Sequence, residues 1–461
     1  MHRLTRLFYC CLLLASCSKD TDRANNLPQD EFIQAYFNHR ATQEQTYIDP
    51  YRQIERPGDN LEAIIIEEIA TAQSSIELAV YELNLPLVAQ ALAGKHRDGV
   101  EVKVILDNDY SQSFTELSSA EISQLNQRDR QKYEQLWQLI DLNQDQQLSS
   151  TEVAQQDALT ILKQAGVSLI DDTADGSKGS GLMHHKFMVI DHEKVIAGSN
   201  NYTLSDIHGD FNNPETQGNV NHLLRINNAQ VANLFSEEFN YMWGNSNAGI
   251  ESRFGVAKSW RSPQSFNWQN TQITIQFSPT SQQQNWSFST NGLIGETIDS
   301  ATKSIDLALF VFSEQELADI LQEKHEQGVE IKGIFDPGFA YRYYSEMLDM
   351  LGISLYLHCQ PEANNNPWLN HLDTVGTALV SSGDKLHHKV AVIDDKIIIS
   401  GSQNWSEAAN YQNDEAVIII TNSKVAQHFV QEVQRLYSSA ILGLSTKLNS
   451  KLEQQQKKCG S

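Results

Sequence analysis

Positive charge is scarce in this chain. Its 461 residues include 34 lysines and arginines against 58 aspartates and glutamates, which gives a formal net charge of -24. The sequence has no long basic stripe and no arginine-rich tract. Because a strongly acidic protein repels a phosphate backbone, this composition argues against a protein that holds nucleic acid through broad, non-specific contacts. Acidic surfaces are also common among soluble proteins, so the charge leaves the type of enzyme open.

Long apolar runs are also missing. The most apolar N-terminal run, residues 7–14, is too short to cross a bilayer as a stable helix. It follows Arg3 and Arg6 and has the length of a signal-peptide core. No other stretch of the sequence could span a membrane. We therefore expect the N-terminal segment to be removed from the mature protein.

The end of this run carries a more specific pattern. The residues Leu14-Ala15-Ser16-Cys17 resemble a bacterial lipobox, which implies cleavage before Cys17 and acylation of its thiol. Ser18 resembles an outer-membrane sorting signal. We expect a lipid-anchored protein of the bacterial cell envelope, at the outer membrane on its periplasmic or surface face. A plain signal peptide without lipidation is the alternative.

Cysteine is scarce as well, with five in the whole chain. Two lie inside the expected signal peptide and Cys17 would carry lipid, which leaves Cys359 and Cys459. One pair in a chain of this length does not describe a disulfide scaffold. Cys459 lies in a polar C-terminal tail that we expect to be mobile, and neither cysteine is given a catalytic role.

The chain does contain an internal repeat. Residues 75–81 resemble residues 304–310, and after a helical stretch in each copy residues 99–107 resemble residues 328–336. Both pairs have the apolar pattern of strands. Strands separated by helices predict two α/β domains, each with a mixed, largely parallel sheet and helices on both faces. The expected organisation is a signal peptide at 1–16, a linker at 17–30, a first domain at 31–250, a connector at 251–271, a second domain at 272–442 and a polar tail at 443–461.

The most informative pattern is His-x-Lys-x4-Asp followed by Gly-Ser-x-Asn. It occupies residues 184–191 and 198–201, and it is repeated at residues 387–394 and 401–404. Because side chains alternate along a strand, the first His and the Lys of each copy share one face, and the second His points to the other. The closing Asp has the opposite parity, so we interpret it as a strand-end residue that bonds to backbone. A phosphodiester reaction needs cations for the nonbridging oxygens, a nucleophile and an acid, and two such sets supply these groups without a metal.

This duplicated motif is similar to the hallmark of the phospholipase D superfamily, over about residues 31–442. The resemblance implies two tandem phospholipase D-like α/β domains, related by a pseudo-two-fold axis, that share one active site within a monomer. It implies that His184 is the nucleophile that forms a phosphohistidine, and that His387 is the general acid and then the base for water. Glu415 is implied as the carboxylate that orients a histidine. The implied catalytic set is His184, Lys186, Asp191, His387, Lys389, Asp394 and Glu415, and the implied phosphate-binding set is Lys186, Asn201, Lys389, Asn404, Ser199 and Ser402.

The first copy departs from the second at the position of Glu415. Its equivalent strand, at residues 222–226, is preceded by Asn221, so the orienting carboxylate is missing there. Glu215 or Asp210 in the preceding loop could substitute, although a solvated loop acid is the simpler interpretation. The assignment of nucleophile and acid therefore stays open.

The first half also contains an insertion, which makes it about 25 residues longer than the second before the motif histidine. The insertion, at about residues 117–165, is expected to be helical, and its residues 141–152 resemble an EF-hand calcium loop. Position six is Gln146 rather than Gly, so a side chain must take a left-handed turn at a cost of about 1 kcal/mol. We expect a structural Ca²⁺ there, against the alternative of an ordinary acidic connection between helices. The candidate ligands are Asp141, Asn143, Asp145, Gln147, Ser149 and Glu152.

Together these patterns predict a phosphoric diester hydrolase that releases phospholipid headgroups and needs no catalytic cofactor. The expected membrane anchor favours a phospholipid over nucleic acid as substrate, although the fold alone does not decide between them. An endonuclease of the same superfamily and a cardiolipin-synthase-like transphosphatidylase stay open as alternatives. A noncatalytic calcium-binding lipoprotein is disfavoured because both motifs are intact.

Overall fold

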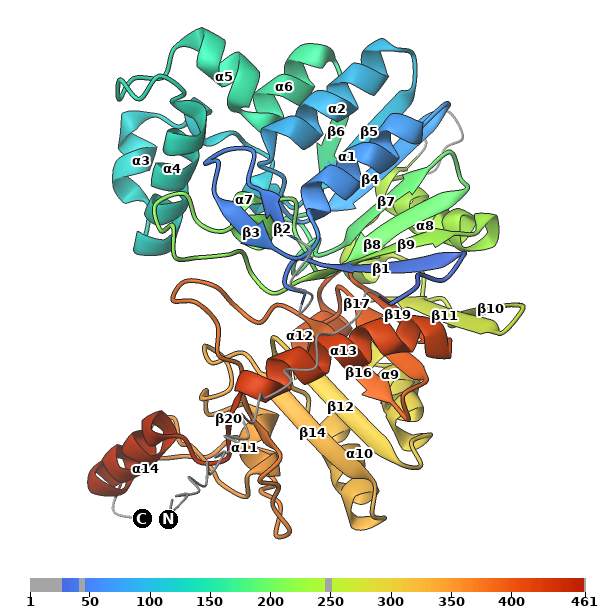
Figure 1. The fold of residues 1–461 in the computed structure, drawn as a ribbon, viewed down its shortest axis with the longest axis vertical. Coiled ribbons are helices and arrows are strands. Elements are labelled where there is room, and N and C mark those ends of the chain that lie inside the picture. The colour runs from blue at the N-terminus through green and yellow to red at the C-terminus, as the bar shows by residue number, and fades with distance from the viewer. Residues whose placement is uncertain (1–26, 41–45, 245–250, 460–461) are drawn as a thin grey trace, which may run out of the picture.

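Two α/β halves lie one above the other in the computed structural model, which describes residues 27–40, 46–244 and 251–459 (Figure 1). The first half is built on a seven-stranded sheet with the strand order β1-β9-β8-β7-β4-β5-β6, and β2 pairs with β3 separately. Its strands are β1 (Ile33–Phe37), β2 (Thr46–Ile48), β3 (Glu55–Pro57), β4 (Ser75–Val80), β5 (Glu101–Leu106), β6 (Ser168–Asp171), β7 (Lys186–Ile190), β8 (Lys194–Gly198) and β9 (His222–Asn227). Its α-helices are α1 (Leu61–Thr71), α2 (Pro86–Arg97), α3 (Ser119–Gln124), α4 (Gln127–Ile140), α5 (Ser150–Gln156), α6 (Ala158–Ala165), α7 (Leu204–Ile207) and α8 (Ala229–Trp243).

The second half repeats this plan on a nine-stranded sheet, with the order β10-β11-β19-β17-β16-β12-β14-β15-β20, and β13 pairs with β18 separately. Its strands are β10 (Gln264–Trp268), β11 (Thr271–Phe277), β12 (Ser304–Leu309), β13 (Phe312–Ser313), β14 (Glu330–Phe335), β15 (Val375–Thr377), β16 (Lys389–Ile393), β17 (Ile397–Gly401), β18 (Trp405–Ser406), β19 (Ala416–Thr421) and β20 (Ile441–Leu442). Its α-helices are α9 (Thr290–Asp299), α10 (Gln315–Glu326), α11 (Glu346–Met350), α12 (Glu407–Tyr411), α13 (Ser423–Ser439) and α14 (Thr446–Cys459).

Both sheets are mixed, as the sequence predicts, but the expectation that they are largely parallel is wrong. In the first sheet only β4, β5 and β6 run parallel, and β1, β9, β8, β7 and β4 pair antiparallel. The second sheet follows the same rule, with β12, β14 and β15 parallel. The motif accounts for one of these pairs, because the chain turns back after β7 within residues 191–193 and the β7–β8 hairpin must be antiparallel.

Helices cover both faces of each sheet, and one core joins the two halves. The adjacent β4 residues Leu78 and Ala79 belong to different apolar clusters, as expected for a strand that is buried on both sides. The cluster that contains Ala79 also draws residues from the second half. Phe37 packs edge-on against Phe429 of α13 at 5.1 Å between ring centroids, which fixes α13 against the first sheet. The halves therefore form one body.

The structure changes the expected limits of the second domain. The strand β10, at 264–268, lies inside the predicted connector but pairs along its length with β11. The predicted tail contains α14, whose Leu448 is fully buried in the second-half core, with Leu452 packed against the same cluster. A disulfide joins Cys459 at the end of α14 to Cys359. The tail is thus a folded element, because an apolar pair at i and i+4 gives α14 a face to bury.

The predicted insertion is helical and comprises α3, α4, α5 and α6. It stands at the outer side of the first half, beside α2 (Figure 1). Cys17 and the expected signal peptide lie outside the described residues. Among the helices of the described part of the chain, none is both long enough and apolar enough to cross a membrane.

Candidate active site

Each half contributes a backbone segment that binds the motif histidine of the other half. The backbone N–H of His184 donates to the carbonyl oxygen of Asp414 at 3.0 Å, and that of His387 donates to the carbonyl oxygen of Val220 at 3.0 Å. Each histidine, placed just before β7 or β16, is therefore held by the segment that precedes the last core strand of the other half. The arrangement has the pseudo-two-fold form expected, with both motifs at one seam.

A buried carboxylate fixes the residue before each histidine. Asp107, at the end of β5, accepts from the backbone N–H of Met183 at 2.9 Å. Asp336, at the end of β14, accepts from that of Leu386 at 3.0 Å. Burial raises the pKa of Asp107 to about 7, with a further contribution from the charge of Asp172. These aspartates anchor the motif segments.

Glu415 orients His184, as the family resemblance implies. Its Oε2 lies 2.9 Å from Nδ1 of His184, and both side chains are buried. With the proton on Nδ1, the ring donates to the carboxylate and keeps the lone pair of Nε2 free. Burial lowers the pKa of His184 to about 4, against the charge of Glu415, which raises it. The neutral ring is thus the ground state at neutral pH, as a nucleophile requires.

Asn221 takes the corresponding place beside His387, a role that the sequence did not predict. Its Oδ1 accepts from Nδ1 of His387 at 3.0 Å. Its Nδ2 donates to the carbonyl oxygens of Asp206 at 3.0 Å and Asn219 at 3.1 Å, which holds the Oδ1 toward the histidine. Asp206, buried and 4.0 Å from the same Nδ1, is the nearest carboxylate. The alignment of Asn221 with Glu415 in the repeat was the signal available in the sequence.

The loop acids considered as substitutes do not reach His387. Glu215 is exposed. Asp210 accepts from Gln135 of the insertion at 3.2 Å. His387 is consequently held by a neutral amide, and burial with the nearby charges of Lys389 and Lys186 keeps its pKa well below the usual value.

The two motif lysines share one buried environment. Each Nζ donates to the carbonyl oxygen of its own histidine at 2.8 Å, Lys186 to His184 and Lys389 to His387. Burial lowers the pKa of Lys186 to about 8, and burial with the charge of Lys186 lowers the pKa of Lys389 to about 7. The effect of Lys186 on the pKa of Lys389 places both side chains at one site. Two neighbouring lysines suit a phosphodiester anion.

The side chains of the motif asparagines and serines differ in their hydrogen bonds. The side-chain carbonyl oxygens of Asn201 and Asn404 are buried and have no hydrogen-bond partner among the described residues, so the fold does not use them. The hydroxyls of Ser199 and Ser402 accept from the backbone N–H groups of His222 and Ala416. Both serines are buried and support the strand backbone, and their part in phosphate binding stays a prediction. Ser199 also donates to the amide oxygen of Asn221 that holds His387.

Asp191 and Asp394 complete the motif pattern but do not join the site. Asp191 accepts from the backbone N–H groups of residues 73–75, and Asp394 accepts from those of residues 302–304. Each carboxylate therefore fixes the start of a neighbouring strand, at the end of β7 or β16 away from the histidines. The backbone-bonding role that strand parity predicts is correct, and a catalytic role for these two residues is not.

The second histidines of the motifs point into the core, as alternation predicts. His185 bonds to Glu238 of α8 at 2.9 Å, and His388 bonds to Glu432 of α13 at 3.2 Å. Lys258, a buried residue of the predicted connector, pairs with Glu238 and with Asp414. These ion pairs stabilise the segment that carries Glu415.

The predicted calcium loop shows one expected backbone feature, the left-handed turn at position six. Gln146 has a φ of 63°, so position six does take the left-handed turn. Asp141 accepts from the N–H of Gln146 at 2.9 Å, and Glu152 caps α5 by bonding to Ser149. Among the described residues, no three His, Cys, Asp or Glu side chains converge as a metal-holding group. Calcium binding rests on the ligand pattern and stays a prediction.

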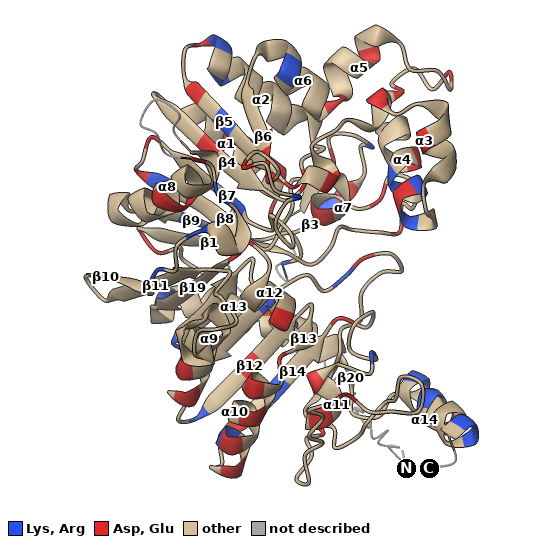
Figure 2. Ribbon diagram, turned by 180° about the vertical axis from the view of Figure 1, so that it is seen from behind, with Lys and Arg blue, Asp and Glu red and all other residues tan. Residues whose placement is uncertain are grey.

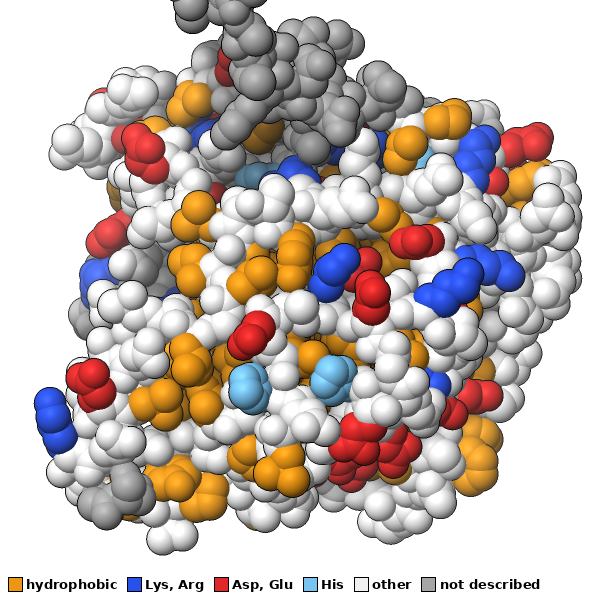
Figure 3. All heavy atoms as spheres, turned by 60° about the horizontal axis from the view of Figure 1, so that its bottom comes forward, with side chains coloured by type: hydrophobic (Ala, Val, Ile, Leu, Met, Phe, Trp, Pro, Cys, Tyr) orange, Lys and Arg blue, Asp and Glu red, His pale blue; other side chains and the backbone are white. Residues whose placement is uncertain are grey.

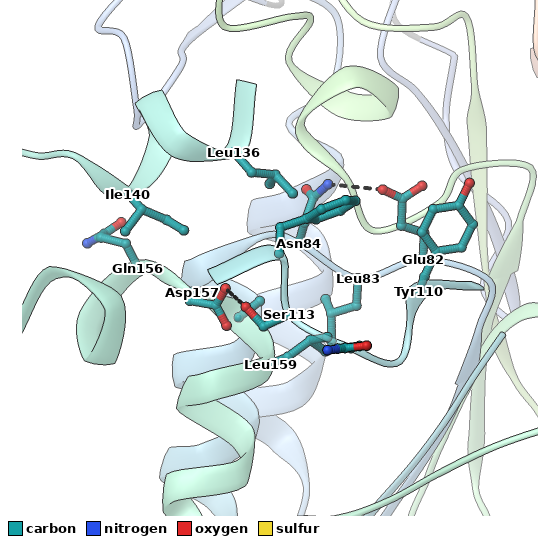
Figure 4. A pocket seen from close by; sticks show the side chains of 13 residues that line it. Glu82, Leu83, Asn84, Tyr110, Ser113, Leu136, Ile140, Gln156, Asp157 and Leu159 are labelled. Atoms are coloured by element: carbon teal, nitrogen blue, oxygen red, sulfur yellow. Dashed lines mark hydrogen bonds between the residues drawn. The ribbon is translucent and has the colours of Figure 1, made fainter. Parts of the chain in front are cut away.

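The insertion packs close to the active site. Lys132 of α4 donates to Glu82 at 2.7 Å and to the hydroxyl of Tyr110 at 2.9 Å. Tyr81, next to Glu82, packs edge-on against the ring of His184 at 5.1 Å. Between α4 and the body of the first half lies a small pocket, which Figure 4 shows with Glu82 and Asn84 on one side and Leu136 on another. The insertion therefore forms part of the wall beside the first motif.

Comparison with known proteins identifies the same architecture. The family described as "Cardiolipin synthase, PLD-like domain" matches residues 65–243 and 294–437. The mitochondrial cardiolipin hydrolase of Mus musculus is 28% identical over 140 residues, 30% of this chain and 53% of that protein. That of Xenopus laevis is 26% identical over 199 residues, 42% of this chain and 69% of that protein. The chain thus spans about half the length of the first of these relatives.

One solved structure matches almost the whole chain. The phosphatidylserine synthase of Haemophilus influenzae Rd KW20 aligns over 92% of this chain and 94% of its own, with a TM-score of 0.55 and 14% sequence identity. At this identity the likeness concerns the fold. It shows that the two halves occur together in this arrangement in another protein.

Proposed function

Because the chain belongs to the family described as "Cardiolipin synthase, PLD-like domain", we propose that it hydrolyses phospholipid phosphodiesters through a covalent phosphohistidine. The observation that carries this proposal is the pair of buried histidines, one from each half, each held through Nδ1 and accompanied by a buried lysine. The Nε2 of neutral His184 supplies a nucleophile, the Nε2 of protonated His387 supplies an acid, and the two lysines supply an anion site.

In the first step, Nε2 of His184 attacks phosphorus and the bond to the leaving oxygen breaks. His387, whose Nδ1–H donates to Asn221, reacts in its imidazolium form and gives its Nε2 proton to that oxygen, which leaves the ring neutral. The carboxylate of Glu415 accepts the hydrogen bond from Nδ1 of His184 and stabilises the positive charge that the ring gains on phosphorylation. Lys186 and Lys389 hold the nonbridging oxygens.

In the second step, water attacks phosphorus from the side that the leaving group has vacated. Nε2 of His387, now without its proton, takes one from the water. The phosphorus–nitrogen bond breaks and its electron pair returns to His184. Asn221 carries no charge, so it stabilises the imidazolium of His387 less than a carboxylate would, which favours the proton release of the first step.

A phospholipid is the substrate that the surroundings favour. The curated relatives are named cardiolipin hydrolases, and the lipobox-like Cys17 would hold the enzyme beside a bilayer in the bacterial envelope, where membrane phosphodiesters are at high effective concentration. The net charge of -24 disfavours the approach of nucleic acid. A transphosphatidylase would use the same first step with an alcohol in place of water.

The test uses the purified chain with mixed micelles of phosphatidylcholine, phosphatidylglycerol or cardiolipin, and with single- and double-stranded DNA. We expect the parent to release headgroups from micelles and to cut DNA slowly or not at all. His184→Asn should have neither activity. Added glycerol should leave phosphatidic acid as the main product if the enzyme is a hydrolase. Degradation of single-stranded DNA much faster than any phospholipid would replace the lipid assignment with an endonuclease.

A further inference from the structure

The helix α14 is a basic element on an acidic protein. Its residues 446–459 include four lysines and one glutamate, whereas the whole chain has a net charge of -24. Figure 2 shows the contrast between α14, which carries blue lysines, and α10, which carries several red acidic residues. A concentration of one charge against the sign of the whole molecule creates a local field that attracts anions.

Three cations of this region lie close together and are not neutralised. Lys451 donates to the carbonyl oxygen of Tyr341 at 2.9 Å, and Nζ of Lys447 lies 5.2 Å from the ring centroid of Tyr341. Burial and then the charges of Lys447 and Arg342 lower the pKa of Lys451, which places all three within electrostatic reach. Within the described residues, none of the three forms an ion pair with a carboxylate. An external anion can therefore approach them.

Exposed aliphatic side chains stand immediately beside these cations. Ile441, Leu442 and Leu444, just before α14, are 46%, 38% and 51% exposed. Figure 3 shows this lower end of the molecule, where hydrophobic side chains reach the surface between scattered charges. Aliphatic groups flanked by lysines are the combination that binds the interface of an anionic bilayer, where the chains enter the headgroup layer and the cations meet lipid phosphates.

The element is held rigidly. Leu448 is buried in the second-half core, and Gln455 accepts from the backbone N–H of Tyr356 at 2.7 Å. The disulfide between Cys359 and Cys459 fixes the far end of the helix to the same loop. The charged face is thus presented in one orientation, which lowers the entropy lost on docking.

The surface also adjoins the reaction centre. Phe310 packs edge-on against His387 at 4.7 Å, and Phe339 packs against Phe310 at 4.7 Å. Residues 339–342 then lead from this contact to Arg342 at the basic surface. A bilayer that contacts α14 would lie beside the rim of the active site.

We propose that α14, Arg342 and residues 441–444 form a docking surface for an anionic lipid bilayer. This inference rests on the proposed phospholipid substrate, since docking would present headgroups to the histidines. Nucleic acid fits the surface less well, because a phosphate backbone makes no use of three exposed aliphatic side chains.

Vesicle sedimentation tests the surface directly, with the full chain carrying Cys17→Ala so that no acyl anchor contributes. The parent should partition onto phosphatidylglycerol–phosphatidylcholine vesicles at least about tenfold better than onto pure phosphatidylcholine. Lys447→Glu/Lys451→Glu should lose most of this preference, and Leu444→Ser should weaken binding to both vesicles. The matched control is Lys303→Glu/Lys396→Glu, which makes the same change of charge at exposed residues just before β12 and between β16 and β17, and it should bind like the parent.

Hydrolysis of the soluble diester bis(4-nitrophenyl) phosphate separates docking from chemistry. The lysine double variant should retain parental turnover of this compound while it loses vesicle binding. Equal vesicle binding by the parent and the double variant would overturn the docking surface. A double variant that keeps vesicle binding but loses binding of single-stranded DNA would also overturn it. Vesicle binding without any phospholipid hydrolysis would leave the surface in place and reject the proposed substrate.

Discussion

Asn221 of the first half holds His387 of the second at 3.0 Å, in the place where Glu415 of the second half holds His184 of the first at 2.9 Å. The two histidines are thus equivalent in the fold but unequal in charge environment. An imidazolium is stabilised by a neighbouring carboxylate and much less by an amide. This difference distinguishes a ring suited to carry a phosphoryl group from one suited to release a proton.

Asn221→Asp should give His387 a carboxylate partner like that of His184. A carboxylate at this position raises the pKa of His387, so the proton that the leaving group needs is retained to higher pH. We expect the alkaline limb of the kcat/KM profile against pH to move upward, with the acid limb unchanged. A profile identical to that of the parent would show that His387 is not the group whose protonation limits the reaction.

Glu415→Gln should act on the other histidine. The carboxylate raises the pKa of His184 against the effect of burial, so its removal lowers that pKa further and moves the acid limb to lower pH. It also removes the stabilisation of the phosphorylated ring, and we expect kcat to fall by about a hundredfold or more. Retention of parental kcat with an unshifted acid limb would exclude the orienting role of Glu415.

Asp394→Asn should affect stability and leave the chemistry intact. Burial alone would raise the pKa of Asp394, but its bonds to Ser304 and the two preceding residues lower that pKa to about 2. A depressed pKa contributes stability above the unfolded value and loses it as the pH falls through the folded one. The variant should therefore melt a few degrees lower than the parent at pH 7, with the gap closing between about pH 4 and 2. A kcat lowered about a hundredfold at 25 °C, with an unchanged melting temperature, would restore a catalytic role.

Calcium should stabilise the insertion through the loop at 141–152. Binding to the folded state alone raises the free energy of unfolding by roughly 2.7 kcal/mol at a hundred times the dissociation constant. We expect calcium to raise the melting temperature of the parent and not that of Glu152→Gln. Calorimetry that shows the same response in both proteins, or none in either, would remove calcium from this loop.

Features that depend on local spacing could be predicted from the sequence. Alternation along the strands predicts that His184 and His185 lie on opposite faces. The same alternation predicts that Asp191 is a strand-end residue. Features that depend on contacts between the halves could not. Asn221 and His387 are 166 residues apart, and only the exchange of segments across the seam shows that an amide replaces a carboxylate there.

Two other differences have local causes that the sequence analysis missed. The short turn after β7 makes an antiparallel hairpin with β8, although helices separate the first strands of each half. The apolar pair Leu448 and Leu452 lies in a stretch rich in Gln and Lys, whose polar composition concealed a helix with one buried face.

The most direct test of the central claim is identification of the phosphorylated residue. Turnover of a phospholipid labelled with ³²P in its phosphate, stopped in strong denaturant and kept at alkaline pH to protect phosphohistidine, should leave the label on the peptide that contains His184. His387→Asn, which retains the nucleophile, should still take up label when the leaving group is a good one such as 4-nitrophenol, and His184→Asn should take up none. Label on His387 in the parent, or turnover by His184→Asn at the parental rate, would contradict the account.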